Sequence, residues 1–170
     1  PVAAADALEI TNGTTALSKA AYVCDSFLGD KTVYFEATID IVDISDVSEL
    51  AFGFRTASAY QAAVNSYDTY ATFNIGGAAD GRVDIETELN GAGLATTDTT
   101  LTDWADGGEH TLRIEVAPDR TCKFFYDGSE PTVTATFTFD AADTIIPFVF
   151  LDTETGDPTV SISSWKVGYK

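Results

Sequence analysis

The chain has 170 residues, 45% of them hydrophobic, so it is long and apolar enough for one domain with a full core. Its 27 acidic and 9 basic residues give a formal net charge of −18, which makes nucleic acids and anionic membranes poor partners. No apolar run reaches the length of a membrane span, and no segment has the basic start and apolar middle of a signal peptide.

Residues 1–30 are predicted to form an N-terminal arm with short strands. The arm begins with small, featureless residues, and strand-like runs follow at Leu8–Ile10 and Ala20–Cys24. We interpret Pro1 as the residue left after removal of an initiator Met. We expect the arm to contact a neighbouring protein, while residues 31–170 form the body of the fold.

Regular alternation begins after the arm and predicts a series of strands. Between Val33 and Ile41 every second side chain is apolar and most of the others are polar, as in a strand with one buried face. Similar strand-like runs occupy residues 50–55, 70–75 and 82–89.

Two segments interrupt this series. The run from Ala57 to Tyr67 breaks the alternation and is either a short helix or a loop with exposed aromatic side chains. Residues 90–106 are polar and rich in Thr and Asp, which predicts a surface loop with one short strand.

The stretch from Gly107 to Gly128 carries the clearest hairpin signal. Apolar and polar side chains alternate over residues 111–116 and again over 121–126, and Pro118 and Asp119 supply a turn between the two runs. The pattern predicts two paired strands with one apolar face and one wet face.

Three further strands are predicted near the C-terminus. The first covers residues 132–139, where the side chains expected to point inward are those of Val133, Ala135, Phe137 and Phe139. The second, Ile145 to Leu151, is apolar on both faces, as in a strand that is covered on both sides or lies at a subunit contact. In the last strand the alternation slips near Ser163 and Ser164, which indicates a bulge.

Cysteine usage is sparse. Cys24 and Cys122 are the two cysteines of the chain, too few for a disulfide scaffold, and both lie in apolar, strand-like surroundings. Two buried free thiols and a single bridge from the N-terminal segment to the body are both compatible with this pattern.

The elements together predict an all-β fold. Ten or eleven strands without a helix-period segment favour an antiparallel two-sheet sandwich. Several passages, in this order, resemble concanavalin A-like jelly rolls of the laminin-G type: 35–41, 51–55, 106–116, 124–128, 146–151 and 164–169. This resemblance implies a jelly-roll sandwich over residues 31–170.

Within that group, the passages Gly53-Phe54-Arg55 and Ala59-Tyr60-Gln61, with the strand at 146–151, are similar to single-domain proteins of tailed bacteriophages. The resemblance implies a non-enzymatic structural virion protein, a capsid decoration (cement) or surface fibre protein. Its partners would be capsid or other virion proteins and further copies of itself, and we expect a trimer. It would be assembled in the host cytoplasm and sit on the virion surface.

No catalytic site is predicted. Asp84, Glu86 and Glu88 alternate on one strand and therefore point to one side. Jelly-roll glycosidases of the laminarinase type carry three strand carboxylates in the order Glu-x-Asp-x-Glu, whereas this chain has Asp-x-Glu-x-Glu. A solvated acidic strand face is the alternative that we favour. His110, the single histidine, is interpreted as structural.

No cofactor is expected, although calcium is considered at two acidic loops. Hard cations bind six to eight oxygen atoms, largely from carboxylates and carbonyls. Laminin-G-type domains often hold calcium at a rim, and ordinary acidic turns are the alternative. The candidate ligands are Asp98, Asp103, Asp106 and Glu109 in one loop, and Asp152, Glu154 and Asp157 in the other.

Flat aromatic rings can stack on the apolar faces of sugars. The residues considered for such a platform are Tyr60, Tyr67, Tyr70 and Trp104, for which core or subunit packing is the alternative. A carbohydrate-binding module or adhesin is therefore the second functional hypothesis, and a laminarinase-like glycoside hydrolase is the third.

Overall fold

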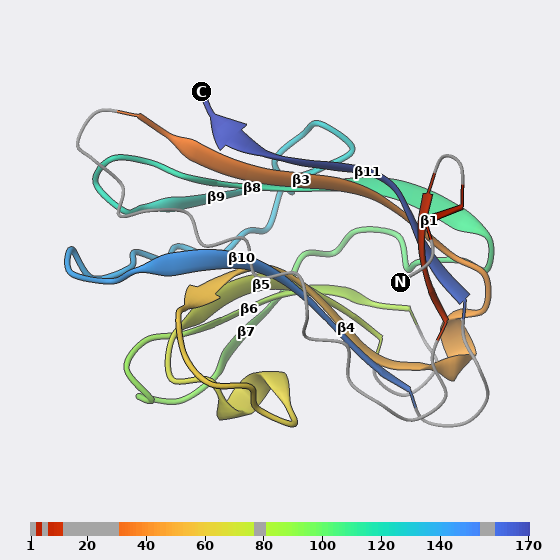
Figure 1. The fold of residues 1–170 in the computed structure, drawn as a ribbon, viewed down its shortest axis with the longest axis horizontal. Coiled ribbons are helices and arrows are strands. Elements are labelled where there is room, and N and C mark those ends of the chain that lie inside the picture. Colours follow the sequence, from red (N-terminus) through yellow and green to blue (C-terminus); the bar gives the residue numbers. More distant parts are fainter. Residues whose placement is uncertain (1–2, 5–6, 12–30, 77–80, 154–158) are drawn as a thin grey trace.

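The computed structural model describes residues 3–4, 7–11, 31–76, 81–153 and 159–170. In this part of the chain two antiparallel sheets are stacked face to face, as Figure 1 shows. The predicted all-β sandwich is therefore confirmed. No helix among the described residues is long and apolar enough to cross a membrane.

One sheet has six strands, in the spatial order β1-β2-β11-β3-β8-β9. Their bounds are Ala3–Ala4 (β1), Ala7–Thr11 (β2), Thr159–Tyr169 (β11), Val33–Ile41 (β3), Gly108–Val116 (β8) and Cys122–Tyr126 (β9). Part of the predicted N-terminal arm belongs to this sheet, because β2 pairs with the final strand β11. The strand predicted at Ala20–Cys24 lies outside the described residues.

The other sheet has five strands, in the order β10-β4-β5-β6-β7. Their bounds are Ile145–Thr153 (β10), Val47–Thr56 (β4), Tyr70–Gly76 (β5), Val83–Glu88 (β6) and Ala95–Asp98 (β7). Two short 3-10 turns, η1 (Ile44–Asp46) and η2 (Val64–Ser66), precede β4 and β5. The segment 57–69 is thus a loop that contains η2, and β7 is the short strand predicted within 90–106.

The core lies between the sheets and follows from strand alternation. On β3, Phe35 is fully buried and its ring stacks on that of Phe52 from the opposite sheet, with 4.1 Å between the ring centroids. Phe73 of β5 meets Phe124 of β9 edge to face in the same layer. Burial of these apolar faces is the main force that holds the two sheets together.

The hairpin predicted at 107–128 is confirmed. Strands β8 and β9 pair antiparallel, with Val116 opposite Cys122 and Leu112 opposite Tyr126. The predicted bulge in β11 is also confirmed, because the register with β3 shifts between Ile162 and Ser164.

The strand predicted at 132–139 is wrong. Phe137 and Phe139 are buried, but Val133 is 40% exposed, and the segment touches its neighbour only through an isolated bridge between Thr121 and Thr138. The segment pairs with the edge of the six-stranded sheet only near the start of β9. An alternating pattern alone does not make a strand, because a strand also needs a continuous hydrogen-bonding neighbour.

Cys122 has a free, buried thiol, and burial raises its pKa. The expectation of a buried free thiol is confirmed for Cys122, whereas Cys24 lies outside the described residues.

Candidate functional site

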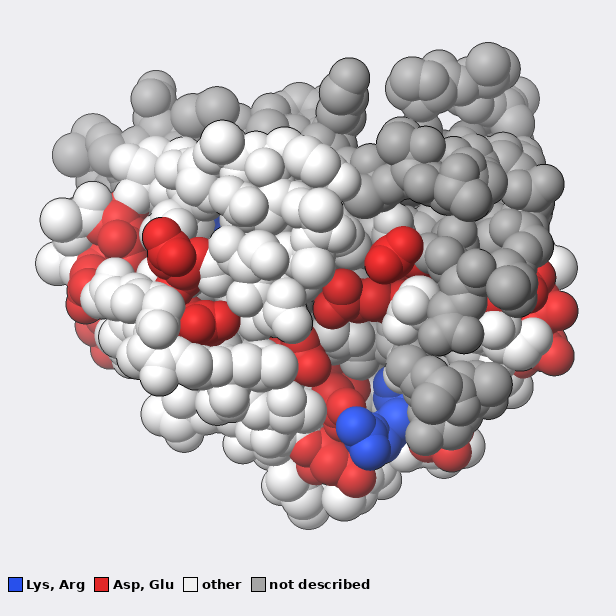
Figure 2. Space-filling model, turned by 90° about the horizontal axis from the view of Figure 1, so that it is seen from below, with Lys and Arg blue, Asp and Glu red and all other residues white. Residues whose placement is uncertain are grey.

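The outer face of the five-stranded sheet carries an unusual concentration of polar side chains. The register places Thr72 of β5 opposite Glu86 of β6, and Asn74 opposite Asp84. Their neighbours along the strands point into the core, so these polar groups point away from it. Figure 2 looks onto this side of the molecule and shows carboxylates gathered in a band through its middle, with a small basic patch against its lower part.

Glu49, Asn74 and Glu86 form the centre of this face, and we call them the carboxylate–amide cluster. The side-chain nitrogen of Asn74 donates to Glu49 Oε1 and to Glu86 Oε2, at 2.8 Å in both cases. Three strands therefore supply one side chain each. All three residues are partly exposed, so a ligand can reach them.

The environment of the cluster disfavours ionised carboxyls. Burial raises the pKa of Glu49 and that of Glu86, and the hydrogen bond from Asn74 offsets part of the rise in each case. Charge repulsion adds to the effect: Glu86 acts on the pKa of Glu49, and Asp84 acts on that of Glu86. Such perturbed acids in a cleft or on a ligand-facing surface are typical of functional sites.

The remaining acids of β6 have partners of their own. Asp84 forms an ion pair with Arg82 at 2.7 Å, and the carboxylate of Glu88 accepts a hydrogen bond from the backbone N–H of Gly93 at 3.2 Å. The three alternating carboxylates do lie on one side of their strand, as the sequence indicated. Glu86 alone among them joins the cluster.

Tyr70 lies beside this group. Its side chain is fully buried, and its hydroxyl has no hydrogen-bond partner among the described residues. Burial raises the pKa of this hydroxyl, and the charges of Glu86, Glu88 and Glu49 raise it further. The phenol thus lies near enough for three glutamates to act on it through their charges, without a hydrogen bond to any of them.

The β10 side of the same face is aromatic instead of acidic. Tyr67, Phe148 and Phe150 pack together there under the loop that contains η2, which Figure 1 shows beneath the five-stranded sheet. The Arg55 guanidinium lies 4.4 Å from the Tyr67 ring centroid and 5.4 Å from that of Phe148. The covering loop explains why β10 is apolar on both faces. Of the two sequence-based alternatives, a strand covered on both sides or one at a subunit contact, the first is therefore the one observed.

The four predicted stacking residues do not lie together. Tyr60 is 52% exposed, whereas Tyr67 and Tyr70 are buried in the cluster beneath η2. Trp104 belongs to the main core, where its indole N–H donates to the carbonyl of Gly108 and its ring packs against His110. Sugar stacking by these residues stays a prediction, and Tyr60 is the ring best placed for it.

The predicted calcium ligands engage backbone donors instead. Asp98 accepts from the N–H of Thr100 at 2.8 Å, and Asp106 accepts from that of Ile44 at 2.9 Å. Asp103 and Asp152 are exposed, and Glu154 and Asp157 lie outside the described residues. Within the described ranges no three His, Cys, Asp or Glu side chains lie close enough to hold a metal ion. Calcium binding stays a prediction.

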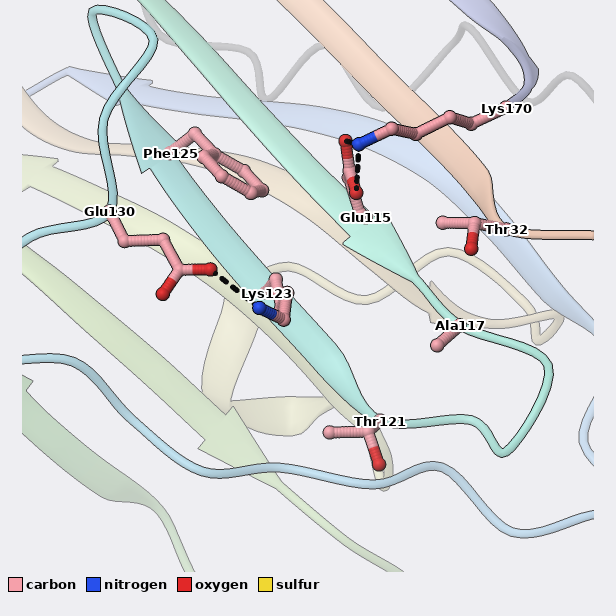
Figure 3. A pocket seen from close by; sticks show the side chains of 8 residues that line it. All are labelled: Thr32, Glu115, Ala117, Thr121, Lys123, Phe125, Glu130 and Lys170. Atoms are coloured by element: carbon pink, nitrogen blue, oxygen red, sulfur yellow. Dashed lines mark hydrogen bonds and ion pairs between the residues drawn. The ribbon is translucent and has the colours of Figure 1, made fainter.

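A shallow cavity of about 320 Å³ opens on the opposite sheet, beside β8 and β9 (Figure 3). Its charges are already paired: Lys123 with Glu130 at 2.9 Å, and Lys170 with Glu115 at 3.3 Å. Phe125 forms part of the lining. The charged groups of this cavity already have partners within the protein. The carboxylate–amide cluster is therefore the stronger candidate site.

Fold and site together define a jelly-roll β-sandwich with an acidic outer sheet face, and known structures share its fold. The alginate lyase AlyC3 in complex with dimannuronate superposes with a TM-score of 0.63 over 96% of this chain and 74% of its own, at 10% identity. The alginate lyase A1-II′, a member of polysaccharide lyase family 7, superposes with a TM-score of 0.58 over 96% of this chain and 79% of its own, at 14% identity. Galectin LEC-6 of Caenorhabditis elegans superposes with a TM-score of 0.52 over 94% of this chain and 95% of its own, at 16% identity.

The chain is shorter than some of these relatives in fold. It spans 63% of the alginate lyase AlyA1 from Zobellia galactanivorans and 60% of the alginate lyase from Corynebacterium sp., with 11% identity to each. The chain matches no protein-family model and no curated protein sequence.

These similarities correct the functional prediction. The structural virion role is wrong, because the structures that share this fold are mainly alginate lyases, with a galectin among them. The likeness to tailed-phage proteins finds no support, and neither do the predicted capsid partners. The concanavalin A-like jelly roll itself is confirmed.

Sequence reasoning missed Glu49 and Asn74. Asn74 is one polar residue on the strand predicted at 70–75, and Glu49 directly precedes the strand predicted at 50–55. Neither has a motif around it. Only the pairing of β4 with β5 and of β5 with β6 brings them to Glu86.

Proposed function

We propose that the protein binds carbohydrate on the outer face of the five-stranded sheet. The observation that carries this proposal is the carboxylate–amide cluster, in which Glu49, Asn74 and Glu86 present hydrogen-bonding groups on a partly exposed surface. The likeness in fold to alginate lyase AlyC3, solved with dimannuronate, supports a sugar ligand.

The chemistry of the cluster suits a polyhydroxylated ligand. Carboxylates accept hydrogen bonds from hydroxyls, and hydrogen bonds to a charged acceptor are stronger than those between neutral groups. A few fixed polar groups on a largely preformed surface are the usual source of specificity in ligand sites. The exposed ring of Tyr60, in the loop that covers β10, adds an apolar surface for a sugar face.

A glycan array followed by calorimetry tests the proposal. We expect binding of at least one glycan class, and Asn74→Ala should weaken it about tenfold or more, because both carboxylates lose the donor that orients them. Glu130→Gln on the opposite sheet is the matched control and should bind like the wild type. Absence of binding across the array, or unchanged affinity in Asn74→Ala, would overturn the proposal.

A second candidate, hydrolysis of a glycosidic bond with retention, is favoured by one distance. The two carboxylate oxygens lie 2.8 Å from the same Asn74 nitrogen and are therefore at most about 5.6 Å apart, whereas retaining glycosidases hold their carboxyl groups about 5 Å apart. In such a reaction one carboxyl protonates the leaving oxygen while the other carboxylate attacks the anomeric carbon. Water then cleaves the glycosyl–enzyme bond.

Release of new reducing ends from soluble glycans tests this second candidate. Activity that disappears in both Glu49→Gln and Glu86→Gln, with binding retained, would support it. Full activity in either variant, or no release from any glycan that binds, would contradict hydrolysis and leave the binding proposal intact.

A further inference from the structure

Two acids on the candidate face are held by hydrogen bonds from an amide instead of by an ion pair. Glu49 and Glu86 form no ion pair within the part of the chain that the structure describes, although each is partly buried. Arg82 is engaged with Asp84, and the Arg55 guanidinium is held over the rings of Tyr67 and Phe148. Arg82 lowers the pKa of Glu86 through its charge, yet burial and the charge of Asp84 act the other way and the pKa is raised. The cluster therefore holds two carboxylates without an ion-pair partner among the described residues.

An independent observation points to a ligand at the same place. The Tyr70 side chain is 0% exposed, and its hydroxyl lacks a partner among the described residues. A buried hydroxyl without a hydrogen bond is destabilising, so proteins rarely retain one that no group ever satisfies. Tyr70 lies on β5 on the same side as Thr72 and Asn74, and the charges of the nearby glutamates act on its hydroxyl.

We propose that the glycan recognised here carries free amino groups, and that one ammonium group binds between Glu49 and Glu86 with the Tyr70 hydroxyl as a third acceptor. This inference rests on the proposed carbohydrate-binding function and names its ligand class. An ammonium group has three donors, which match two carboxylates and one phenol oxygen. The cation also offsets the cost of holding two like charges close together.

The charge of the whole molecule acts in the same direction. A net charge of −18 attracts polycations and repels polyanions, and Figure 2 shows the acidic band on the face that the ligand would approach. A polyuronate such as the dimannuronate bound to AlyC3 would bring further negative charge to this surface. The proposed ligand therefore carries a charge opposite to that of dimannuronate, although the protein shares its fold with AlyC3.

The test compares four oligosaccharides of equal length by calorimetry: glucosamine, N-acetylglucosamine, glucose and mannuronate oligomers. We expect the glucosamine oligomer to bind at least about tenfold tighter than its N-acetylated partner at low salt, with a smaller gap at high salt because the attraction is screened. Glu86→Gln should lower the affinity for the amine about tenfold, and Tyr70→Phe should lower it by a smaller factor. Glu130→Gln is the control, and circular dichroism verifies that each variant is folded.

The outcomes separate the two proposals. Equal affinity for the amine and its acetylated partner, or tightest binding of the mannuronate oligomer, would overturn the amine inference and leave carbohydrate binding standing. Binding of none of the four, together with a negative glycan array, would overturn both. A preference for the amine that survives Glu86→Gln would show that the ammonium binds elsewhere and would also reject the inference.

Discussion

Glu86 is placed where a carboxylate costs stability, which is expected of a residue kept for binding. Its pKa is raised because burial disfavours the charged form, and the fold therefore prefers the protonated acid. The stabilising contribution of such a group is complete below its ordinary pKa of 4.5 and is lost as the pH rises through the folded-state pKa. The pKa of Glu49 is also raised by burial, so its contribution to stability depends on pH in the same way.

Glu86→Gln is therefore expected to stabilise the protein at neutral pH. Removing the charge removes the penalty, so the thermal midpoint at pH 7 should rise by about 2–4 °C, while near pH 4 the variant and the wild type should melt together. Thermal denaturation followed by circular dichroism at both pH values measures this difference. The exposed, ion-paired Glu130→Gln is the control and should show no gain. The raised pKa of Glu86 would be contradicted if the gain in thermal midpoint over the wild type were smaller at pH 7 than at pH 4.

At the scale of elements, strand β10 depends on the loop between β4 and β5. Phe150 points to the outer side of the sheet yet is fully buried, because Val64 and Tyr67 cover it. The five-stranded sheet thus has a second small core on the side away from its partner sheet. The covering loop fixes one flank of the candidate face while the acidic flank stays open.

Phe150→Ala should therefore destabilise the protein as strongly as a change in the main core. We expect a loss of about 3–5 kcal/mol in the free energy of unfolding, measured by urea denaturation. Phe125→Ala, at a partly exposed position on β9, is the matched control and should lose clearly less. Similar losses in both variants would mean that the covering loop does not pack on β10.

The pairing of β4 with β5 requires glycine at position 53. A Cβ atom there would lie 2.2 Å from the carbonyl oxygen of Ala71 and 2.8 Å from the Cα of Thr72, both of them backbone atoms of β5. The two strands would have to separate, and the contacts that align Glu49 with the sheet would shift with them.

Gly53→Ala is expected to cost at least about 2 kcal/mol of unfolding free energy in urea, because backbone atoms cannot move aside without breaking the ladder. Gly168→Ala provides the comparison. There the nearest atoms, at 3.1 Å, belong to the Tyr34 side chain, which can yield by a few tenths of an ångström. If Gly168→Ala were the more damaging of the two, the close approach of β4 and β5 would be refuted.

At the scale of the whole molecule, charge is the dominant feature. With 27 acidic and 9 basic residues, the folded state brings many like charges together. Several basic side chains form ion pairs on the side of the six-stranded sheet, where Arg113 bridges Glu36 and Glu115. The acidic face of the other sheet gains little from them.

Salt should therefore stabilise the fold. Raising NaCl from about 10 mM to about 300 mM shortens the Debye length from roughly 30 Å to below 10 Å and screens repulsion between surface carboxylates. We expect the thermal midpoint at pH 7 to rise over this range, with most of the change at low salt. An uncharged osmolyte at equal osmolality serves as the control. A midpoint that falls with salt would show that attractive ion pairs outweigh the repulsion.

Much of the sandwich could be read from the sequence, as the hairpin at 107–128 and the bulge near Ser163 illustrate. Both are local features, set by turn residues and by alternation along one strand. The segment 132–139 has the same alternation but no continuous partner, because a strand needs a neighbour as well as a pattern. The functional prediction failed at a larger scale, since short passages shared by many jelly rolls were interpreted as evidence for one role.

The sequence by itself determined which side chains of each strand face inward, because the period-two pattern of a strand is local chemistry. It placed Glu86 on the outer side of its strand and predicted an acidic surface. Only the tertiary structure decided that Glu49 and Asn74 lie beside Glu86 and that Tyr70 is buried next to them. These contacts depend on the strand order β4-β5-β6 and on its register, which the packing of the entire core selects and no single segment encodes.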